Sequence, residues 1–315
     1  MTRRILSIDG GGIRGIIPLC ALIQLEAQTG KPVREHFDFL AGTSTGAIIA
    51  GALAQGLSAE RCLQLYQEAG PAVFRRDWLL WISSLFSYKY RTAPMRDLLQ
   101  RYLGDVVLNE LPVDVMLTAT RVQDGKNWFF VRDCLANAQT TGQLKLNDCI
   151  TASAAAPTFF EPWDVPGIGP CVDGGVGIAG NPVYQACVEA FYYTTEAYVP
   201  AETIVVSLGT GVYPALHHPA NLIDWVQFLI GELLDAPSEQ QTAVVLRHFT
   251  DTHTYRWNPQ LPQEIGLDAI ERIPDLIKIG QKAAQADLDW AKILAGADTA
   301  NRVLPKTMAV ERNRP

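Results

Sequence analysis

The chain has 315 residues, of which 48% are hydrophobic and 19% charged, a balance typical of an ordered globular protein. Its net charge of −7 and the lack of any Lys/Arg-rich run argue against general nucleic-acid binding and against broad adhesion to anionic membranes. No stretch approaches the roughly 18–20 apolar residues that span a bilayer, and the first residues lack a signal-like apolar segment, so we expect a cytoplasmic protein.

Short apolar strands alternate with helices along the first two thirds of the chain. In chain order we expect a strand at 4–8, a helix ending near 29, a strand at 37–41, helices at 45–55 and 58–69, and strands at 113–120, 128–131, 170–172 and 203–208. This alternation predicts a three-layer α/β fold, with a mainly parallel central sheet and helices on both faces. Residues 1–211 would form the core, and 212–315 a helix-rich extension packed on it within one continuous domain.

The junction between the second strand and its helix carries the first chemical signal. Residues 42–46 read Gly-Thr-Ser-Thr-Gly, which places Ser44 on a sharp strand-to-helix turn. Glycines at 42 and 46 let the strand and the helix close around a strained central residue. The pattern predicts acyl transfer to Ser44, whereas a turn that happens to contain a serine is the alternative.

A glycine run lies between the first strand and the first helix. Residues 9–15 read Asp-Gly-Gly-Gly-Ile-Arg-Gly, and consecutive amide groups at a helix N-terminus attract negative charge. A nucleotide phosphate and the oxyanion of acyl transfer are both candidates for that charge. Glu26 is too near the run to hold a ribose, and Glu35 lies just before a turn. Because the next strand also ends in Ser44, the sequence favours an oxyanion hole.

A serine nucleophile needs a proton acceptor. The histidines are His36, His217, His218, His248 and His253. The last four formally complete a Ser-Asp-His order, yet surface or packing roles fit them better. Asp173 is a better candidate, because it ends an apolar strand and is followed by Gly174 and Gly175. We expect it at the tip of a parallel strand, where α/β sheets collect their active sites, although a turn role also fits.

These elements together resemble the patatin-like phospholipases, a family of serine lipid acyl hydrolases. The matching motifs are residues 9–15, 42–46 and 173–175, with two accessory blocks at 153–160 and 207–211. Their order and approximate spacing match over residues 5–211. One departure is Gly180-Asn181-Pro182, where members often carry Asn-Asn-Pro, and this removes no catalytic group.

The resemblance implies a Ser-Asp dyad without histidine. Ser44 would attack an ester carbonyl, and Asp173 would take its proton and later activate water. The implied oxyanion donors are Gly11 and Gly12, together with Gly10 or Thr45, and the implied supporting residues are Arg14, Gly42, Gly46, Gly174 and Gly175. Arg14 would favour a phosphate or hold the loop, and a structural salt bridge fits it equally. No metal or organic cofactor is implied.

The activity implied is that of a lipid acyl hydrolase, of the phospholipase A or esterase type, acting on glycerophospholipids or related acyl lipids. A general esterase and an acyltransferase use the same dyad, so the sequence does not separate water from another alcohol as acceptor. A non-catalytic lipid-binding or interaction protein on this scaffold is the alternative from another class.

Two further segments suggest lipid or protein partners. Residues 75–91 are rich in Trp, Leu and Tyr between cationic flanks, a composition that suits peripheral membrane contact; a buried helix or a dimer contact is the alternative. After residue 211, Trp225, Phe228, Leu229 and Leu233 recur at helical spacing. That stripe fits a lid, a homo-oligomer face, an activator site or simple core packing.

Overall fold

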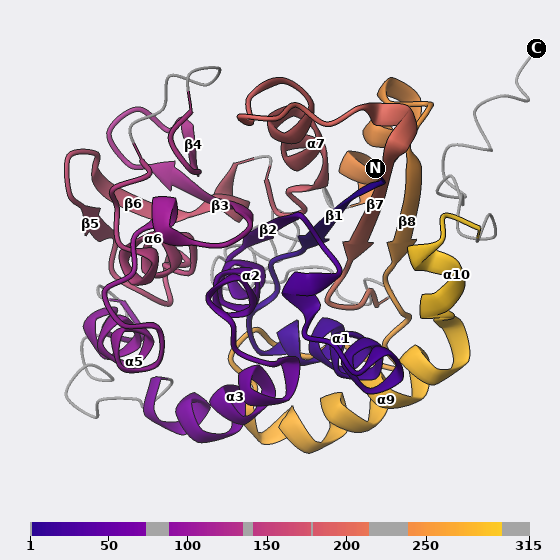
Figure 1. The fold of residues 1–315 in the computed structure, drawn as a ribbon. Coiled ribbons are helices and arrows are strands. Elements are labelled where there is room, and N and C mark those ends of the chain that lie inside the picture. The colour runs from indigo at the N-terminus through magenta and orange to yellow at the C-terminus, as the bar shows by residue number, and fades with distance from the viewer. Residues whose placement is uncertain (1, 74–87, 135–140, 178, 214–238, 298–315) are drawn as a thin grey trace, which may run out of the picture.

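The computed structural model describes residues 2–73, 88–134, 141–177, 179–213 and 239–297 (Figure 1). Within these ranges an eight-stranded sheet forms the centre of the molecule, in the order β5-β6-β3-β2-β1-β7-β8, with β4 paired to β3. The strands are β1 Arg3–Ile8, β2 Phe39–Thr43, β3 Asp114–Arg121, β4 Asn127–Phe130, β5 Trp163–Val165, β6 Gly169–Asp173, β7 Thr203–Leu208 and β8 His253–Trp257. The helices are α1 Ile16–Thr29, α2 Thr45–Gln55, α3 Ala59–Val73, α5 Ala93–Leu103, α6 Leu146–Ser153, α7 Val183–Tyr192, α9 Ile273–Asp287 and α10 Trp290–Leu294.

Helices cover both faces of the sheet, as the sequence predicts. Successive side chains of a strand point to opposite faces, so Ile5 and Leu6 of β1 enter different core clusters. Ile5 belongs to the cluster that includes α7, whereas Leu6 belongs to the larger cluster that includes α1, α2 and α9. Figure 1 shows α7 on one side of the sheet and α1, α2, α3 and α9 on the other. The predicted three-layer α/β fold is confirmed.

The middle of the sheet is parallel, and one edge is not. Strands β3, β2, β1, β7 and β8 run parallel to one another, so their carboxyl ends meet at one edge of the sheet. Strand β6 pairs antiparallel with β3, and β5 pairs antiparallel with β6. The expectation that Asp173 ends a parallel strand is therefore wrong, because β6 lies alongside β3 and runs in the opposite direction, away from the edge where the parallel strands end.

The C-terminal residues contribute a strand as well as helices. Strand β8, which the sequence analysis did not anticipate, lies beside β7 and extends the sheet. Helix α9 packs against α1 (Figure 1), and Trp290 of α10 is fully buried, with its indole N–H donating to the Ala21 carbonyl at 3.1 Å. The described residues after 211 thus share the sheet and the core of the preceding ones.

Two predictions fall wholly or mostly outside the described residues. Residues 74–87 make up most of the aromatic segment expected at a membrane surface, and the stripe from Trp225 to Leu233 lies within 214–238. Both stay predictions. Among the helices that the structure describes, none combines the length and apolar character needed to cross a bilayer.

Candidate active site

Ser44 occupies a strained backbone position between β2 and α2. Its φ of 57° and ψ of −123° lie where a residue with a Cβ is rarely found. A Cβ on Gly42 would overlap the Gly46 carbonyl, and one on Gly46 would overlap the Ile8 carbonyl. Glycine at both positions therefore lets β2 and α2 approach closely and leaves the serine at the tip of the turn. Ser153 supports this turn, because its hydroxyl oxygen accepts the Ser44 N–H at 3.0 Å.

The register of β2, β3 and β6 places Asp173 level with Ser44 in the sheet. Thr43, the last residue of β2, pairs with Thr118 of β3, and the next residue of β3, Ala119, pairs with Asp173. Asp173 thus lies level with Ser44, with β3 between their strands. A Cβ on Gly174 would overlap the Thr118 hydroxyl, so glycine there allows the chain to turn away immediately.

The carboxyl group of Asp173 is fully buried beside the Ser44 hydroxyl. Burial raises its pKa to about 6, although interactions with the Ser44 hydroxyl and the Gly175 amide lower it. The Gly175 N–H donates to Oδ1 at 2.8 Å, whereas Oδ2 has no well-aligned hydrogen bond within the described ranges. The two side chains are therefore in contact but not aligned, as is common for catalytic groups without substrate.

The described histidines have other partners. His36 hydrogen-bonds to the Thr29 hydroxyl at 2.9 Å, and His248 stacks on Tyr184, while His253 begins β8. His217 and His218 lie outside the described residues.

The glycine run lies directly beside Ser44. A Cβ built on Gly10 would stand 3.3 Å from the Ser44 Cβ. The amides of Gly11, Gly12 and Thr45 donate to no acceptor in the part of the chain that the structure describes. Gly10 is different, because its N–H donates to the Gly180 carbonyl at 2.9 Å. Of the two alternatives for the additional oxyanion donor, Gly10 or Thr45, Thr45 fits better, because the Gly10 amide is already occupied.

Arg14 contacts the loop and not the cavity. Its side chain is buried, its Nε donates to the Gly11 carbonyl at 3.4 Å, and its guanidinium lies 5.5 Å from the centre of the Tyr213 ring. Of the roles considered for it, holding the loop fits these contacts best.

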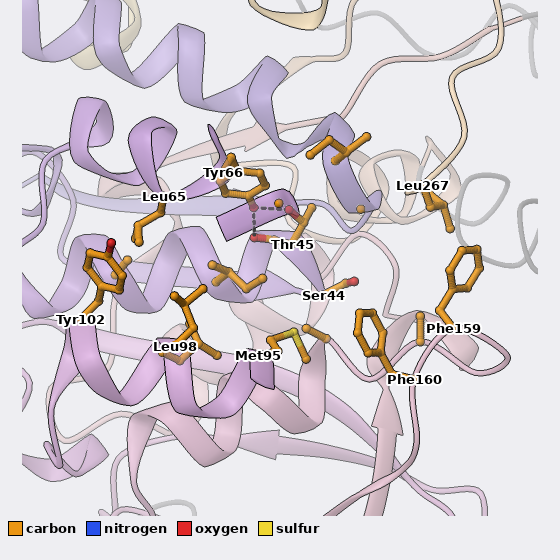
Figure 2. A pocket seen from close by; sticks show the side chains of 18 of the residues that line it. Ser44, Thr45, Leu65, Tyr66, Met95, Leu98, Tyr102, Phe159, Phe160 and Leu267 are labelled. Carbon is orange, nitrogen blue, oxygen red and sulfur yellow. Dashed lines mark hydrogen bonds between the residues drawn. The ribbon is translucent and has the colours of Figure 1, made fainter. Parts of the chain in front are cut away.

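An apolar cavity of about 110 Å³ begins at Ser44 (Figure 2). It runs between α2, α3 and α5, where Ile48, Leu65 and Leu98 line it. Phe159 and Leu267 lie near Ser44, whereas Tyr102 and Leu65 lie at the far end in Figure 2. These side chains suit an alkyl chain and offer little to a charged group.

A half-buried tyrosine, Tyr66, contacts Thr45, the residue that follows Ser44. The Tyr66 hydroxyl hydrogen-bonds to the Thr45 hydroxyl and donates to the Thr45 carbonyl at 3.3 Å, as the dashed lines in Figure 2 mark. Burial raises the pKa of this phenol, so it stays protonated. Its two hydrogen bonds hold Thr45 in place beside Ser44.

Sequence reasoning missed several of these residues. Ser153 lies within an accessory block that the resemblance marked, and the apolar spacing of α5 could have indicated the cavity wall. Tyr66 and Leu267 carry no comparable local signal, because their roles depend on contacts with distant segments.

The fold and the site define a class of protein, and comparisons with known proteins agree with it. The family model described as patatin-like phospholipase matches residues 6–187, and the chain belongs to this family.

Individual relatives cover different parts of the chain. A cGAMP-activated phospholipase of Escherichia coli (strain TW11681) is 31% identical over 60% of this chain and 56% of its own length. The calcium-independent phospholipase A2-gamma of Rattus norvegicus is 28% identical over 98% of this chain and 40% of its own length. Patatin-T5 of Solanum tuberosum is 31% identical over 50% of this chain and 43% of its own length. The chain thus spans about half the length of these relatives.

Proposed function

We propose that the chain is a lipid acyl hydrolase of the phospholipase A type, which works through a Ser44–Asp173 dyad. One observation carries the proposal: the Ser44 hydroxyl lies against a buried carboxyl group at the end of an apolar cavity. The family and the named activities of its relatives support a lipid ester as substrate.

The first half of the reaction acylates the serine. Ser44 Oγ attacks the ester carbonyl carbon while its proton passes to Asp173, whose pKa of about 6 makes it a better acceptor than an exposed aspartate. The amides of Gly11, Gly12 and Thr45 stabilise the oxyanion that forms. Collapse of the tetrahedral intermediate breaks the bond to the leaving alcohol, which takes the proton from Asp173.

The second half releases the fatty acid. Asp173 removes a proton from water, the hydroxide attacks the acyl carbon, and the Ser44 oxygen leaves with that proton. The apolar cavity holds the acyl chain throughout, so the ester carbonyl stays between Ser44 and the amides.

Product analysis tests the proposal. Wild-type protein is incubated with phosphatidylcholine and phosphatidylethanolamine vesicles, and fatty acid and lysophospholipid are quantified by mass spectrometry. Ser44→Ala should lose at least about 10³-fold in rate, because the nucleophile is gone. Ser58→Ala, which removes a serine at the start of α3, is the matched control and should keep the rate.

The alternatives give different results. A non-catalytic lipid-binding protein would release no product and would not be labelled at Ser44 by a fluorophosphonate. An acyltransferase would convert added lysophospholipid to diacyl product faster than it releases fatty acid. Product formation unchanged in Ser44→Ala would refute the dyad.

A further inference from the structure

A buried arginine from β8 contacts the residue that begins the glycine loop. The Arg256 side chain is 8% exposed and forms an ion pair with Asp9, whose side chain is 4% exposed. The pair is bidentate, with Nη1 at 3.0 Å from Oδ1 and Nη2 at 2.7 Å from Oδ2. On its other side, Arg256 donates to Glu239 Oε1 from Nε at 3.1 Å and from Nη2 at 2.9 Å.

The sheet explains why only a long, forked side chain makes this contact. Arg256 pairs in register with Ser207 of β7, and Ser207 pairs with Ser7 of β1. The backbones of β8 and β1 lie two strand spacings apart, about 9.6 Å, so the Arg256 and Asp9 side chains extend toward each other and meet across β7. On the way Nη1 donates to the Ser207 hydroxyl at 2.9 Å. A lysine of similar length would offer a point charge and not the planar fork that binds both carboxylate oxygens.

The conformation of the loop that follows Asp9 is not stabilised by side chains of its own, because Gly10, Gly11 and Gly12 have none. It is instead held from outside: the Thr210 hydroxyl donates to the Gly10 carbonyl at 2.8 Å, and the Leu267 carbonyl accepts the Ile13 N–H at 2.8 Å. Oxyanion donors work only when they stay within about 0.5 Å of the productive geometry. A buried ion pair is weak support for stability, so geometric control is the better explanation for this one.

We propose that Arg256 is a positioning residue which, through Asp9, holds the amides of Gly11 and Gly12 in oxyanion-binding geometry. This inference rests on the proposed function, since it assigns a role within that reaction. Arg256 touches no substrate and acts only through the loop.

Kinetics on a soluble ester test it. With p-nitrophenyl butanoate, Arg256→Lys keeps the charge but loses the fork; its kcat should fall roughly 100-fold, as for displaced oxyanion donors, while KM changes by less than about threefold. Trp257→Phe is the matched control, because it removes a partly buried hydrogen bond to Asp287 from the next residue of β8. Trp257→Phe should keep its kcat within about twofold of wild type, even if its thermal stability falls as much as that of Arg256→Lys.

A double-mutant cycle tests the route through Asp9. Asp9→Asn keeps the size of the side chain, leaves Arg256 paired with Glu239, and should lower kcat as Arg256→Lys does. The double variant should lose no more than either single variant, since both break one contact. If Arg256→Lys fails to fold, Asp9→Asn alone decides, through the same fall in kcat at unchanged KM.

Two outcomes overturn the inference: wild-type kcat in Arg256→Lys or Asp9→Asn, or losses that add in the double variant. Ser44→Ala separates this result from failure of the proposed function. If Ser44→Ala is inactive while Arg256→Lys and Asp9→Asn are fully active, only the role of Arg256 is refuted. If Ser44→Ala keeps its activity, the dyad itself is wrong.

Discussion

Replacement of Asp173 by Asn should abolish hydrolysis and yet stabilise the fold. Burial raises the pKa of this carboxyl group from 3.8 to about 6. Because one pKa unit corresponds to 1.36 kcal/mol, the charged form lowers the free energy of unfolding by up to about 3 kcal/mol at neutral pH. Asparagine carries no charge, still accepts the Gly175 N–H, and can donate to the Ser44 hydroxyl. We therefore expect Asp173→Asn to be more stable than wild type at pH 7.5 by up to that amount.

Asp173→Asn should be at least as stable as wild type at every pH, but the size of the stability difference depends on pH. The folded pKa lies above the unfolded one, so the wild-type protein loses stability as pH rises from about 3.8 to about 6 and loses no more above that. The advantage of Asp173→Asn should be full at pH 7.5 and much smaller at pH 4.5. Urea unfolding followed by tryptophan fluorescence at both values measures it.

Asp289→Asn serves as the control. Asp289 caps α10, and its hydrogen bond to Lys292 lowers its pKa, so its replacement should give no gain in stability. An Asp173→Asn protein that is less stable than wild type at pH 7.5, or an advantage independent of pH, would show that the buried carboxylate does not oppose folding.

Two predictions concern the reaction itself. With a short-chain ester, kcat/KM should fall about tenfold per pH unit below about pH 6, because protonated Asp173 cannot accept the serine proton; a rate still at its maximum at pH 5 would contradict its role as base. Leu98→Phe narrows the cavity, so kcat/KM for dodecanoyl esters should fall at least about tenfold while that for butanoyl esters changes little. Equal losses on both esters would place the acyl chain elsewhere.

Local patterns were enough to predict the central strands and the nucleophile turn. The alternation and apolar run of the strand and of the helix beginning at Thr45 are visible locally, and the close contact of Gly42 with Gly46 joins residues four positions apart. The helix expected from residue 58 also begins there, since the Ser58 hydroxyl accepts the Arg61 N–H at 3.1 Å. Such features depend on residues a few positions apart, which a single sequence displays directly.

The direction of β6 was not predictable in this way. Apolar patterning indicated a strand that ends at Asp173, but pairing direction depends on which strand it meets. The same limit applies to Gly10, whose amide is occupied by a carbonyl 170 residues further along the chain.

The sequence alone determined the family, the α/β alternation and the residue types available for chemistry, because strand and helix periods and glycine turns are short-range properties. Only the tertiary structure decided that Asp173 lies beside Ser44, that three helices line an apolar cavity, and that Arg256 forms an ion pair with Asp9, 247 positions away. Those contacts arise when whole helices and strands pack together. No local sequence pattern encodes which distant side chains will then meet.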